Sequence, residues 1–375
     1  MKIGIITPMI APYRVTFFEK LSNLNDIDLV VFHNVKKTED GRPAFIGELE
    51  FSNETYDIVR LEVLSIYIDF YKNLFSKLKN KECDVLILQA APSVFSSWVI
   101  SLWARWYGKK VVFWACGWEP EHSKILKRIK QIVLKRYFAL GNLFIAYSTT
   151  AKNYLENNGV NTENIQVAYN GIETDEYQNI KKKVREDAKL LKKSYPSESK
   201  IFLYVGGIFK EKQVDLLLRA FSELQQKHKN SVLWVIGDGP DLDSLKLFAD
   251  NLCLENVVFF GRIIHGVDKY FCAADVFVLP GIGGLGLNQA MLWDCPCIVS
   301  KADGTEEDLV IENKTGFRFS QGDQRSLVTA MEKFLNISNS DYKILCENGR
   351  KFVLSKSNVN NMVDVFKDTF LKLKF

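Results

Sequence analysis

Short apolar runs alternate with helix-like segments along almost the whole chain, and this alternation constrains the fold more than any other feature. The runs in the first half are rich in β-branched residues, and the segments between them, such as residues 13–24 and 94–108, carry apolar residues at helical spacing. Strands that are apolar throughout are typical of parallel sheets covered by helices on both faces. The alternation restarts near residue 200, so we predict two doubly wound, Rossmann-like α/β domains. The predicted strands are KIGIIT, DLVVFH, DVLILQ, KVVFWA, LFIAYS and IQVAYN, and then IFLYVG, SVLWVIG, VVFFG, VFVLP and PCIVS.

The length of 375 residues agrees with two domains, because a single core rarely extends so far. Residues 173–199 are strongly charged and lack apolar periodicity, so we place the linker there. The first domain is then predicted at 1–172 and the second at 200–345. Residues 346–375 are predicted to form C-terminal helices, and whether these pack on the second domain or return to the first is left open. Two such domains facing one another leave a central cleft, and open α/β sheets bind ligands beyond the carboxyl ends of their strands.

Composition and charge exclude several classes of protein. Apolar residues make up 47% and charged residues 25%, which is the balance of a globular protein, and no run of eighteen apolar residues is free of charge. The N-terminal apolar run is too short for a signal peptide, so we expect a cytoplasmic protein, with a peripheral position on the inner face of the membrane kept open. A net charge of +4 without a concentrated basic face does not predict nucleic-acid binding. The first strand also lacks the G-x-G-x-x-G turn of an NAD enzyme.

No metal site is predicted. The seven cysteines lie mostly in apolar segments, and Cys295 and Cys297 are too close together and too isolated for a zinc site. The DLD triplet at 241–243 follows a turn and is typical of a helix start rather than of a metal-binding Asp-x-Asp.

Four glycine turns follow strands of the second half. They lie at residues 206–212, 237–239, 261 and 281–286, the last within the stretch VFVLPGIGGLGLNQAML. Glycine lets a backbone turn sharply and bring its N–H groups close to a ligand. For the second turn, a plain strand-to-helix turn without a ligand is an equal alternative. One such turn is weak evidence, but four at one edge of a sheet predict a nucleotide pocket.

These turns and their surroundings resemble the family 4 glycosyltransferases, which have the GT-B fold. The resemblance covers roughly residues 200–320, through YVGGIFKEKQVDLLLRAF, LWVIGDGPDLDSL, VVFFGRI, AADVFVLPGIGGLGLNQAM, PCIVSKADGTEEDLV and NKTGFRF in the family's order. The first half matches more loosely, through PMIAPYRVTFFEKL, FWACGWEPEH, LFIAYSTTAKNYLENNGV and IQVAYNGIET. The resemblance implies transfer of a sugar, with retention at the anomeric carbon and without a metal ion, from a nucleotide-sugar co-substrate. A UDP-sugar is the expected donor, although these residues do not identify the base or the sugar.

The resemblance also implies a set of donor-binding residues in the second domain. Lys212 is expected at the phosphates, with help from Arg262 or Lys210, and Gln289 at the ribose. Gly283 and Gly284 are expected at the reacting sugar, where backbone amides take over from the family's first glutamate. Glu306 is favoured as a further donor contact over a purely local charge at a helix start. The complete donor-side set is Gly206, Gly207, Lys212, Arg262, Ile263, Gly281, Leu285, Gln289 and Glu306.

Several of these positions depart from the family's pattern. The family's usual loop has two glutamates eight positions apart, and Gly281 and Gln289 stand in their places. Gly207 replaces the usual arginine beside the phosphate lysine, which removes a bidentate charged contact that a backbone cannot replace. Some family members share the PGxxGL form of this loop, which favours a variant subgroup over a decayed site.

The first domain contributes weaker candidates. Cys116 replaces the family's histidine near the donor, and His122 follows a few residues later, so both are catalytic candidates. Trp118 and Glu119 are acceptor-side candidates, although a surface loop would explain Glu119 and His122 equally well. Arg14 lies in the loop after the first strand, where it meets a phosphate of donor or acceptor or remains a solvated arginine.

The segment SKILKRIKQIVLKRYFAL, residues 123–140, has isoleucine and valine on one helical face and lysines around the other. Most such helices pack on their own domain, but the basic excess also suits an anionic membrane surface.

Two function classes stay open. The favoured one is a retaining glycosyltransferase acting on a glycan or lipid-linked acceptor in surface polysaccharide biosynthesis. The alternative is a catalytically weakened GT-B protein that binds a nucleotide or glycan as a partner subunit.

Overall fold

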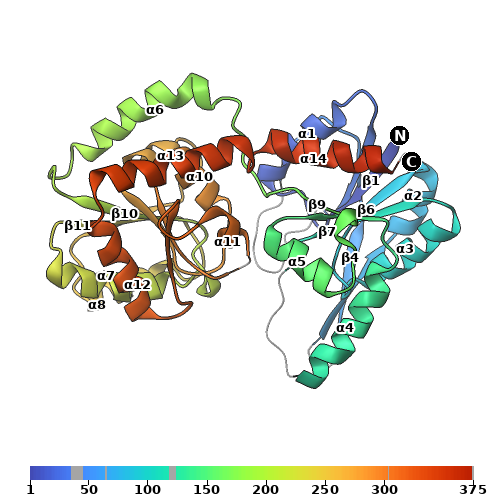
Figure 1. Cartoon of the computed structure of the whole chain (residues 1–375), viewed down its shortest axis with the longest axis horizontal. Helices are drawn as coiled ribbons and strands as arrows, with labels where there is room; N and C mark the ends of the chain where they lie inside the picture. The colour runs from blue at the N-terminus through green and yellow to red at the C-terminus, as the bar shows by residue number, and fades with distance from the viewer. Residues whose placement is uncertain (35–44, 64–65, 118–123, 303, 374–375) are drawn as a thin grey trace. The chain divides into compact units, whose positions relative to one another are not determined.

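The computed structural model describes residues 1–34, 45–63, 66–117, 124–302 and 304–373, and the side chains of residues 63, 66 and 124–130 are left aside. The chain divides into two compact units (Figure 1). Unit 1 comprises Met1–Asn170 and Val359–Phe375, and unit 2 comprises Gly171–Asn358. Each unit is an α/β fold around its own parallel sheet, which confirms the predicted fold class.

The sheet of unit 1 has seven parallel strands in the order β3-β2-β1-β6-β7-β8-β9. All six predicted strands of the first half are present in it, and most are buried because helices cover both faces. The predicted set missed the short edge strand β3. The strands are β1 (Lys2–Ile6), β2 (Asp28–His33), β3 (Asn53–Thr55), β6 (Val85–Gln89), β7 (Lys110–Ala115), β8 (Leu143–Ala146) and β9 (Ile165–Val167).

Helices pack on both faces of this sheet and form two separate apolar cores. One core includes residues of α2, α3, α4 and α5, and the other includes residues of α1 and α14. Helix α5 starts where the Ser148 hydroxyl accepts a hydrogen bond from the Ala151 N–H at 3.0 Å, which satisfies a free amide of the first turn. The helical segments are η1 (Pro12–Arg14), α1 (Val15–Ser22), α2 (Leu74–Lys81), α3 (Phe95–Trp106), α4 (Lys124–Phe138), α5 (Thr149–Asn157), η2 (Thr162–Asn164) and α14 (Val359–Lys372).

An antiparallel hairpin of β4 (Asp57–Val63) and β5 (Ile66–Lys72) was not predicted from the sequence. Arg60 and Asp69 face each other across it, with Nε and Oδ1 2.7 Å apart. The hairpin packs on α3, where the Phe70 and Phe95 rings lie 5.3 Å apart. Its strands mix apolar and charged residues, so they lack the uniformly apolar pattern by which the other strands were recognised.

The sheet of unit 2 has six parallel strands in the order β12-β11-β10-β13-β14-β15. The five predicted strands of the second half are all present, and β15 completes the sheet. The strands are β10 (Lys200–Val205), β11 (Ser231–Ile236), β12 (Val257–Gly261), β13 (Val276–Leu279), β14 (Cys297–Ser300) and β15 (Gly316–Phe319). The helical segments are α6 (Tyr177–Lys192), η3 (Lys210–Lys212), α7 (Val214–Lys227), α8 (Leu242–Asn251), α9 (Asp268–Ala273), α10 (Gly286–Leu292), α11 (Thr305–Leu309), α12 (Gln324–Leu335) and α13 (Asn339–Ser355).

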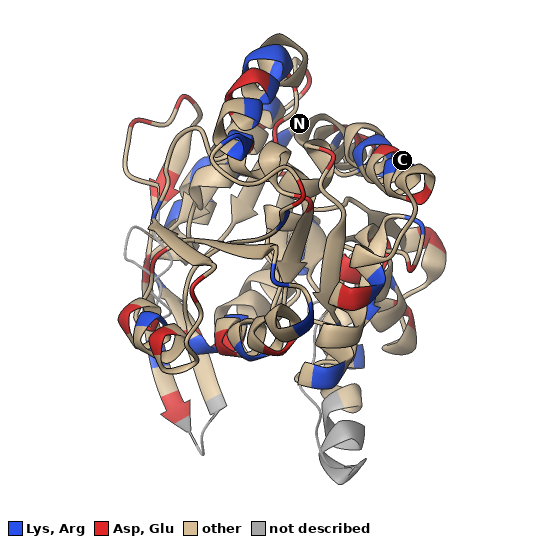
Figure 2. Ribbon diagram, turned by 90° about the vertical axis from the view of Figure 1, so that its left-hand side faces the viewer, with Lys and Arg blue, Asp and Glu red and all other residues tan. Residues whose placement is uncertain are grey.

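The expected linker at 173–199 differs from the structure, because most of it forms helix α6 and belongs to unit 2. Tyr177 and Ala188 are buried against the core of unit 2, and Lys192 pairs with Asp275 at 2.8 Å. Figure 2 shows the many charges of this helix at the top of the view. Its apolar residues are few and widely spaced, so the charged face hid the helical periodicity in the sequence.

The two C-terminal helices separate between the units, with the division at 358/359 rather than at 345/346. Helix α13 packs with α10 in unit 2, whereas α14 lies beside α1 in unit 1. In α14, Met362, Phe366 and Phe370 are buried in the core that contains α1. The option that the C-terminal helices return to the first domain therefore holds for α14 and not for α13.

Candidate functional site

Strand β10 lies at the point where the order of the sheet in unit 2 reverses. It pairs with β11 on one side and with β13 on the other. The strands that follow β10 in the chain are thus added first on one side of it and then on the other. Loops that follow the strands on the two sides of such a point lie next to each other at the carboxyl edge, where open α/β sheets bind ligands. The two loops here are residues 206–213 and 280–285, and they overlap the first and fourth predicted glycine turns, at 206–212 and 281–286.

Hydrogen bonds join these two loops directly. The Ile282 N–H donates to the Glu211 carbonyl at 3.1 Å. The Lys212 ammonium donates to the carbonyls of Ile282 at 2.9 Å and Gly283 at 2.5 Å. A Cβ on Gly281 would lie 2.2 Å from the Glu211 carbonyl oxygen, so only glycine allows this approach of the two backbones. The sequence predicted both loops, and the structure shows that hydrogen bonds join them to each other.

Lys212 is thus held at the centre of the candidate site. It is half-buried, and its ammonium bonds to two backbone carbonyls of the neighbouring loop. Its Nζ lies 5.5 Å from the centre of the Phe209 ring. A Cβ on Gly284 would lie 3.8 Å from Nζ, so the exposed Gly284 lies beside the ammonium. An anion bound here would meet a fixed cation and a stretch of open backbone.

The first and second glycine turns pack tightly against each other. The Ile208 N–H donates to the Asp238 carbonyl at 2.9 Å, and a Cβ on Gly237 would lie 1.8 Å from the Gly206 carbonyl oxygen. The hydroxyl of Tyr204 donates to the Gly207 carbonyl at 2.7 Å, while burial raises the pKa of this phenol. Backbone packing therefore accounts for Gly237, in line with the alternative of a turn without a ligand. Gly206 and Gly207 lie beside it as parts of the same packed turn.

Gln289 makes a contact within the protein that the sequence did not predict. Its side-chain Nε2 donates to the Asp268 carboxylate at 2.9 Å, and Trp293 Nε1 donates to the same oxygen at 2.6 Å. Gln289 lies in α10 and Trp293 is the C-cap residue one turn later, so both reach Asp268 in α9. No sequence motif pointed to Asp268. The Gln289 amide is therefore fixed in orientation, and its role at a ribose stays a prediction.

Glu306 has a different environment from the predicted donor contact. Its side chain is fully buried, and its carboxylate accepts hydrogen bonds from the N–H groups of Ala302 and Gly304. A buried carboxylate is stabilised by such donors, so Glu306 shapes the loop before α11. The next residue, Glu307, is half-buried and lies 3.5 Å from Arg318, measured between Oε1 and Nη2.

The remaining donor-side candidates are spread along the edge of the sheet. Arg262 is exposed directly after β12, two strands away from β10, and Ile263 packs partly against the core of unit 2. Leu285 is half-buried and precedes α10. The sheet thus brings Lys212, Gly281, Gly283 and Gly284 together at the reversal point, while Arg262 lies on a strand farther out.

Only part of the first-domain prediction falls on described residues. Trp118, Glu119 and His122 lie outside them. Cys116 is exposed just after β7. Arg14 is 8% exposed and lies among aromatic rings, so the alternative of a solvated arginine was wrong.

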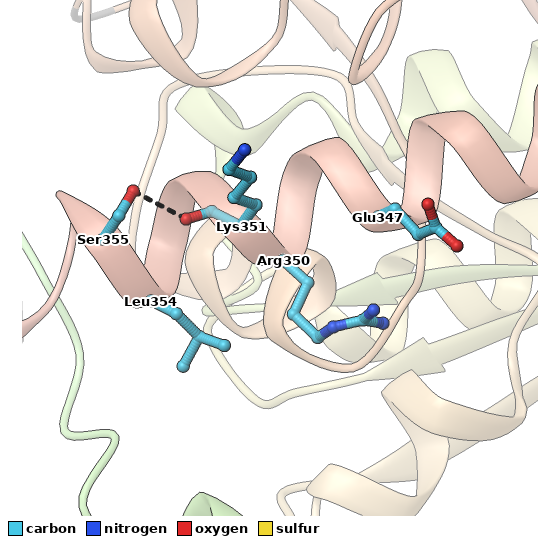
Figure 3. A pocket seen from close by; sticks show the side chains of 5 residues that line it. All are labelled: Glu347, Arg350, Lys351, Leu354 and Ser355. Atoms are coloured by element: carbon cyan, nitrogen blue, oxygen red, sulfur yellow. Dashed lines mark hydrogen bonds between the residues drawn. The ribbon is translucent and has the colours of Figure 1, made fainter.

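A shallow pocket on α13 is separate from these loops (Figure 3). It is lined by Glu347, Arg350, Lys351, Leu354 and Ser355, all from one helix. The Arg350 guanidinium forms an ion pair with Asp294, and the Ser355 hydroxyl donates to the Lys351 carbonyl at 2.7 Å. The pocket therefore lies on the surface of a single helix, and we assign it no role.

Among the described residues, no group of three or more His, Cys, Asp or Glu side chains is suitable for holding a metal ion. Within the same residues, no helix is both long and apolar enough to cross a bilayer.

The two Rossmann-like units place the protein in the GT-B structural class. HepE of Anabaena in complex with UDP aligns with a TM-score of 0.73 at 16% identity, covering 99% of this chain and 100% of that one. Sucrose-phosphate synthase from Thermosynechococcus elongatus aligns with a TM-score of 0.72 at 16% identity, covering 100% and 99%. At these identities the similarity shows the fold alone.

Sequence comparison then identifies the family. Glycosyltransferase Family 4 matches residues 20–176, and Glycosyl transferases group 1 matches residues 186–352. This chain belongs to the family 4 glycosyltransferases.

Two curated relatives illustrate the range of the family. An uncharacterized glycosyltransferase of Methanocaldococcus jannaschii is 26% identical over 245 residues, which are 64% of this chain and 60% of that protein. CapM, the capsular polysaccharide biosynthesis glycosyltransferase of Staphylococcus aureus, is 28% identical over 214 residues, which are 54% of each protein. The chain thus matches between about half and three fifths of the length of these two relatives.

Proposed function

We propose that this protein is a retaining, metal-independent glycosyltransferase that moves a sugar from a nucleotide-sugar, with UDP as the expected nucleotide, to a glycan or lipid-linked acceptor. The observation that carries the proposal is the joining of the Lys212 loop and the 280–285 loop at the reversal point of the unit 2 sheet. Relatives named for capsular polysaccharide, lipopolysaccharide and sulfoquinovosyl transfer support a role in surface glycan or glycolipid synthesis. Solved structures of HepE with UDP and with UDP-glucose support the nucleotide.

In this proposal the Lys212 ammonium neutralises charge on the diphosphate as the bond to the sugar breaks. Backbone N–H groups of Gly283 and Gly284 act beside it, where the family's pattern has a glutamate that this chain lacks. Fixed donors aimed at a leaving group lower the barrier because they need no reorganisation during the reaction. Gln289 keeps its amide oxygen for a ribose hydroxyl while its nitrogen is held by Asp268.

The direct test is a panel of nucleotide-sugars, read by melting temperature and by release of the nucleoside diphosphate. A true donor should raise the melting temperature, because a ligand that binds the folded state stabilises it. Slow hydrolysis of that donor in the absence of acceptor would establish turnover. Binding without any release, with several acceptors present, would instead favour the partner-subunit alternative.

Chelation should leave the reaction unchanged. We expect the rate of nucleoside diphosphate release in EDTA to equal the rate in added magnesium, because Lys212 and backbone amides supply the positive charge in this proposal. The measurement compares EDTA, magnesium and manganese at equal ionic strength. Loss of turnover in EDTA that either ion restores would show that a metal carries the leaving-group charge.

The proposed lipid-linked acceptor implies an anionic membrane surface, and α3 and α4 of unit 1 are suited to it. The exposed side of α3 carries an apolar stripe at helical spacing, where Trp106 is 87% exposed. Residues 85–117 contain Arg105 and two lysines but no acidic residue. We define the stripe as Phe95, Val99, Leu102 and Trp106.

Helix α4 lies next to α3, as the 4.8 Å separation of the Trp98 and Tyr137 rings shows. Ile132 and Val133 of α4 are exposed instead of packing on their own unit, while Leu134 and Tyr137 are buried. An exposed apolar surface flanked by basic residues is typical of binding to anionic lipid.

We expect the double variant Leu102→Asp and Trp106→Asp to lose binding to vesicles that contain phosphatidylglycerol. Each replaced side chain removes about 1.5 to 3 kcal/mol of apolar burial, or roughly tenfold or more in affinity. Sedimentation with vesicles measures the bound fraction, and Leu247→Asp, an exposed apolar residue of α8 in unit 2, is the matched control. Equal binding by the double variant and the control would reject this surface.

A further inference from the structure

Arg14 is a buried cation without a carboxylate partner among the described residues. It is the last residue of η1, in the segment that follows β1, and 8% of its surface is exposed. Its guanidinium carbon lies 4.8 Å from the centre of the Trp114 ring and 5.3 Å from that of Tyr147. Aromatic faces attract a cation, but they do not neutralise its charge or accept its N–H groups in the way that an oxyanion does.

The acceptors around Arg14 are few and weak. Its Nη1 donates to the Met362 sulfur at 3.0 Å, and its side chain also bonds to the Tyr147 hydroxyl. A thioether is a weak acceptor, and a guanidinium has five N–H donors. Burial raises the pKa of Tyr147, so its hydroxyl stays neutral and contributes no negative charge. Most of the donor capacity of Arg14 is therefore unused within the described protein.

Trp114 provides a second donor without an acceptor at the same place. Its Nε1 is buried and has no hydrogen-bond partner in the described structure. Because a buried N–H without a partner destabilises the folded protein, such groups usually have a reason to be there. Here the indole and the guanidinium, both donors only, lie side by side.

This pair lies at the ligand-binding edge of unit 1. Trp114 is near the carboxyl end of β7, and Tyr147 directly follows β8. Tyr13, which is 51% exposed, lies over the guanidinium with its ring centre 5.4 Å away. Tyr13 thus covers the guanidinium with a largely exposed ring.

We propose that Arg14 and Trp114 form an anion-binding subsite for a phosphate group on the ligand of unit 1. The guanidinium binds two phosphate oxygens, and the indole N–H donates to a third, which a tetrahedral anion can offer in a different direction from the first two. That this ligand is the sugar acceptor rests on the proposed function, but the binding of the anion does not. In this proposal the phosphate group belongs to the ligand of unit 1 and not to the nucleotide.

The substitution Arg14→Met distinguishes this role from a purely structural one. Methionine keeps the length and apolar packing of the side chain among the aromatic rings. Arg14 has no carboxylate partner in the described part of the chain, so removing its buried charge should leave the melting temperature unchanged or raise it. A structural arginine held by its aromatic contacts would instead lower the melting temperature when replaced.

The binding test is calorimetry with inorganic pyrophosphate, both with saturating UDP and without it. Arg14→Met should bind pyrophosphate roughly 10- to 150-fold more weakly than the parent in the presence of UDP, the loss expected for a charged hydrogen-bonded contact. Arg14→Lys should also bind weakly, because lysine lacks the planar fork. The control Arg105→Met removes the same charge from an exposed position of α3 and should bind like the parent.

Three results would overturn the proposal. One is equal pyrophosphate affinity in Arg14→Met and Arg105→Met. Another is a weaker affinity of Arg14→Met for UDP itself, which would assign the anion to the nucleotide. The third is a lower melting temperature of Arg14→Met with unchanged pyrophosphate binding. Because neither titration measures turnover, failure of the proposed transferase activity would leave this result readable.

Discussion

Gly281→Ala should destabilise unit 2 by about 3 kcal/mol, the upper part of the range for overpacking. The added Cβ would lie 2.2 Å from the Glu211 carbonyl oxygen and 2.6 Å from the Lys212 carbonyl carbon. Both are backbone atoms, so neither can rotate away as a side chain would. The loop after β13 must then separate from the loop after β10, and the hydrogen bond from Ile282 to Glu211 breaks.

Two measurements test the predicted effect of Gly281→Ala. The melting temperature should fall by roughly 6 to 12 °C for a unit of this size. Binding of UDP should be lost at temperatures where the variant is still folded. The control is Gly349→Ala in α13, whose Cβ would meet side-chain atoms of Met291 at 3.2 and 3.4 Å, and a side chain can shift where a backbone cannot. A Gly281→Ala protein that melts and binds like the parent would show that the contact of the two loops is dispensable.

Lys212→Ala should weaken UDP binding by roughly 10- to 150-fold, which corresponds to about 1.5 to 3 kcal/mol for a charged hydrogen bond. The lysine has two roles that the substitution removes together. It supplies the positive charge in the candidate site, and it holds the carbonyls of Ile282 and Gly283. Sugar transfer should therefore fall further than binding, because the loop that faces the reacting bond also loses its fixed position.

Calorimetry with UDP and single-turnover transfer separate these two roles. Lys210→Ala is the control, since Lys210 is an exposed cation in the same short helix η3. Unchanged UDP affinity in Lys212→Ala would remove the lysine from the phosphate site. A large loss in Lys210→Ala would show instead that general charge at this edge, rather than one held ammonium, attracts the nucleotide.

The sequence alone determined the architecture of both units, because parallel strands that are buried on both faces must be apolar throughout. That requirement made β1, β2, β6, β7, β10, β11 and β13 recognisable as uninterrupted apolar runs. It failed for the hairpin of β4 and β5, whose charged residues face solvent or pair with each other, as Arg60 and Asp69 do. It also failed for α6, where a charged outer face concealed the positions of Tyr177 and Ala188.

The glycine turns were predictable for a similar local reason. A glycine directly after a buried strand marks a sharp turn or a close approach of backbones, and Gly281 is required by such an approach. The sequence could not show what each turn approaches. The approach of Gly281 to Glu211 and of Gly237 to Gly206 depends on which strands are neighbours, and that order is a property of the whole sheet.

Only the tertiary structure decided what the polar side chains do. Gln289 is held by Asp268 and Glu306 by backbone amides of its own loop, and neither partner followed from a motif. Arg14 is buried because Trp114 of β7 and Tyr147, which directly follows β8, pack around it from far away in sequence. Local spacing sets the secondary structure, since each helix or strand buries its own face. The partner of a polar group depends instead on which distant segments the fold brings within hydrogen-bonding distance.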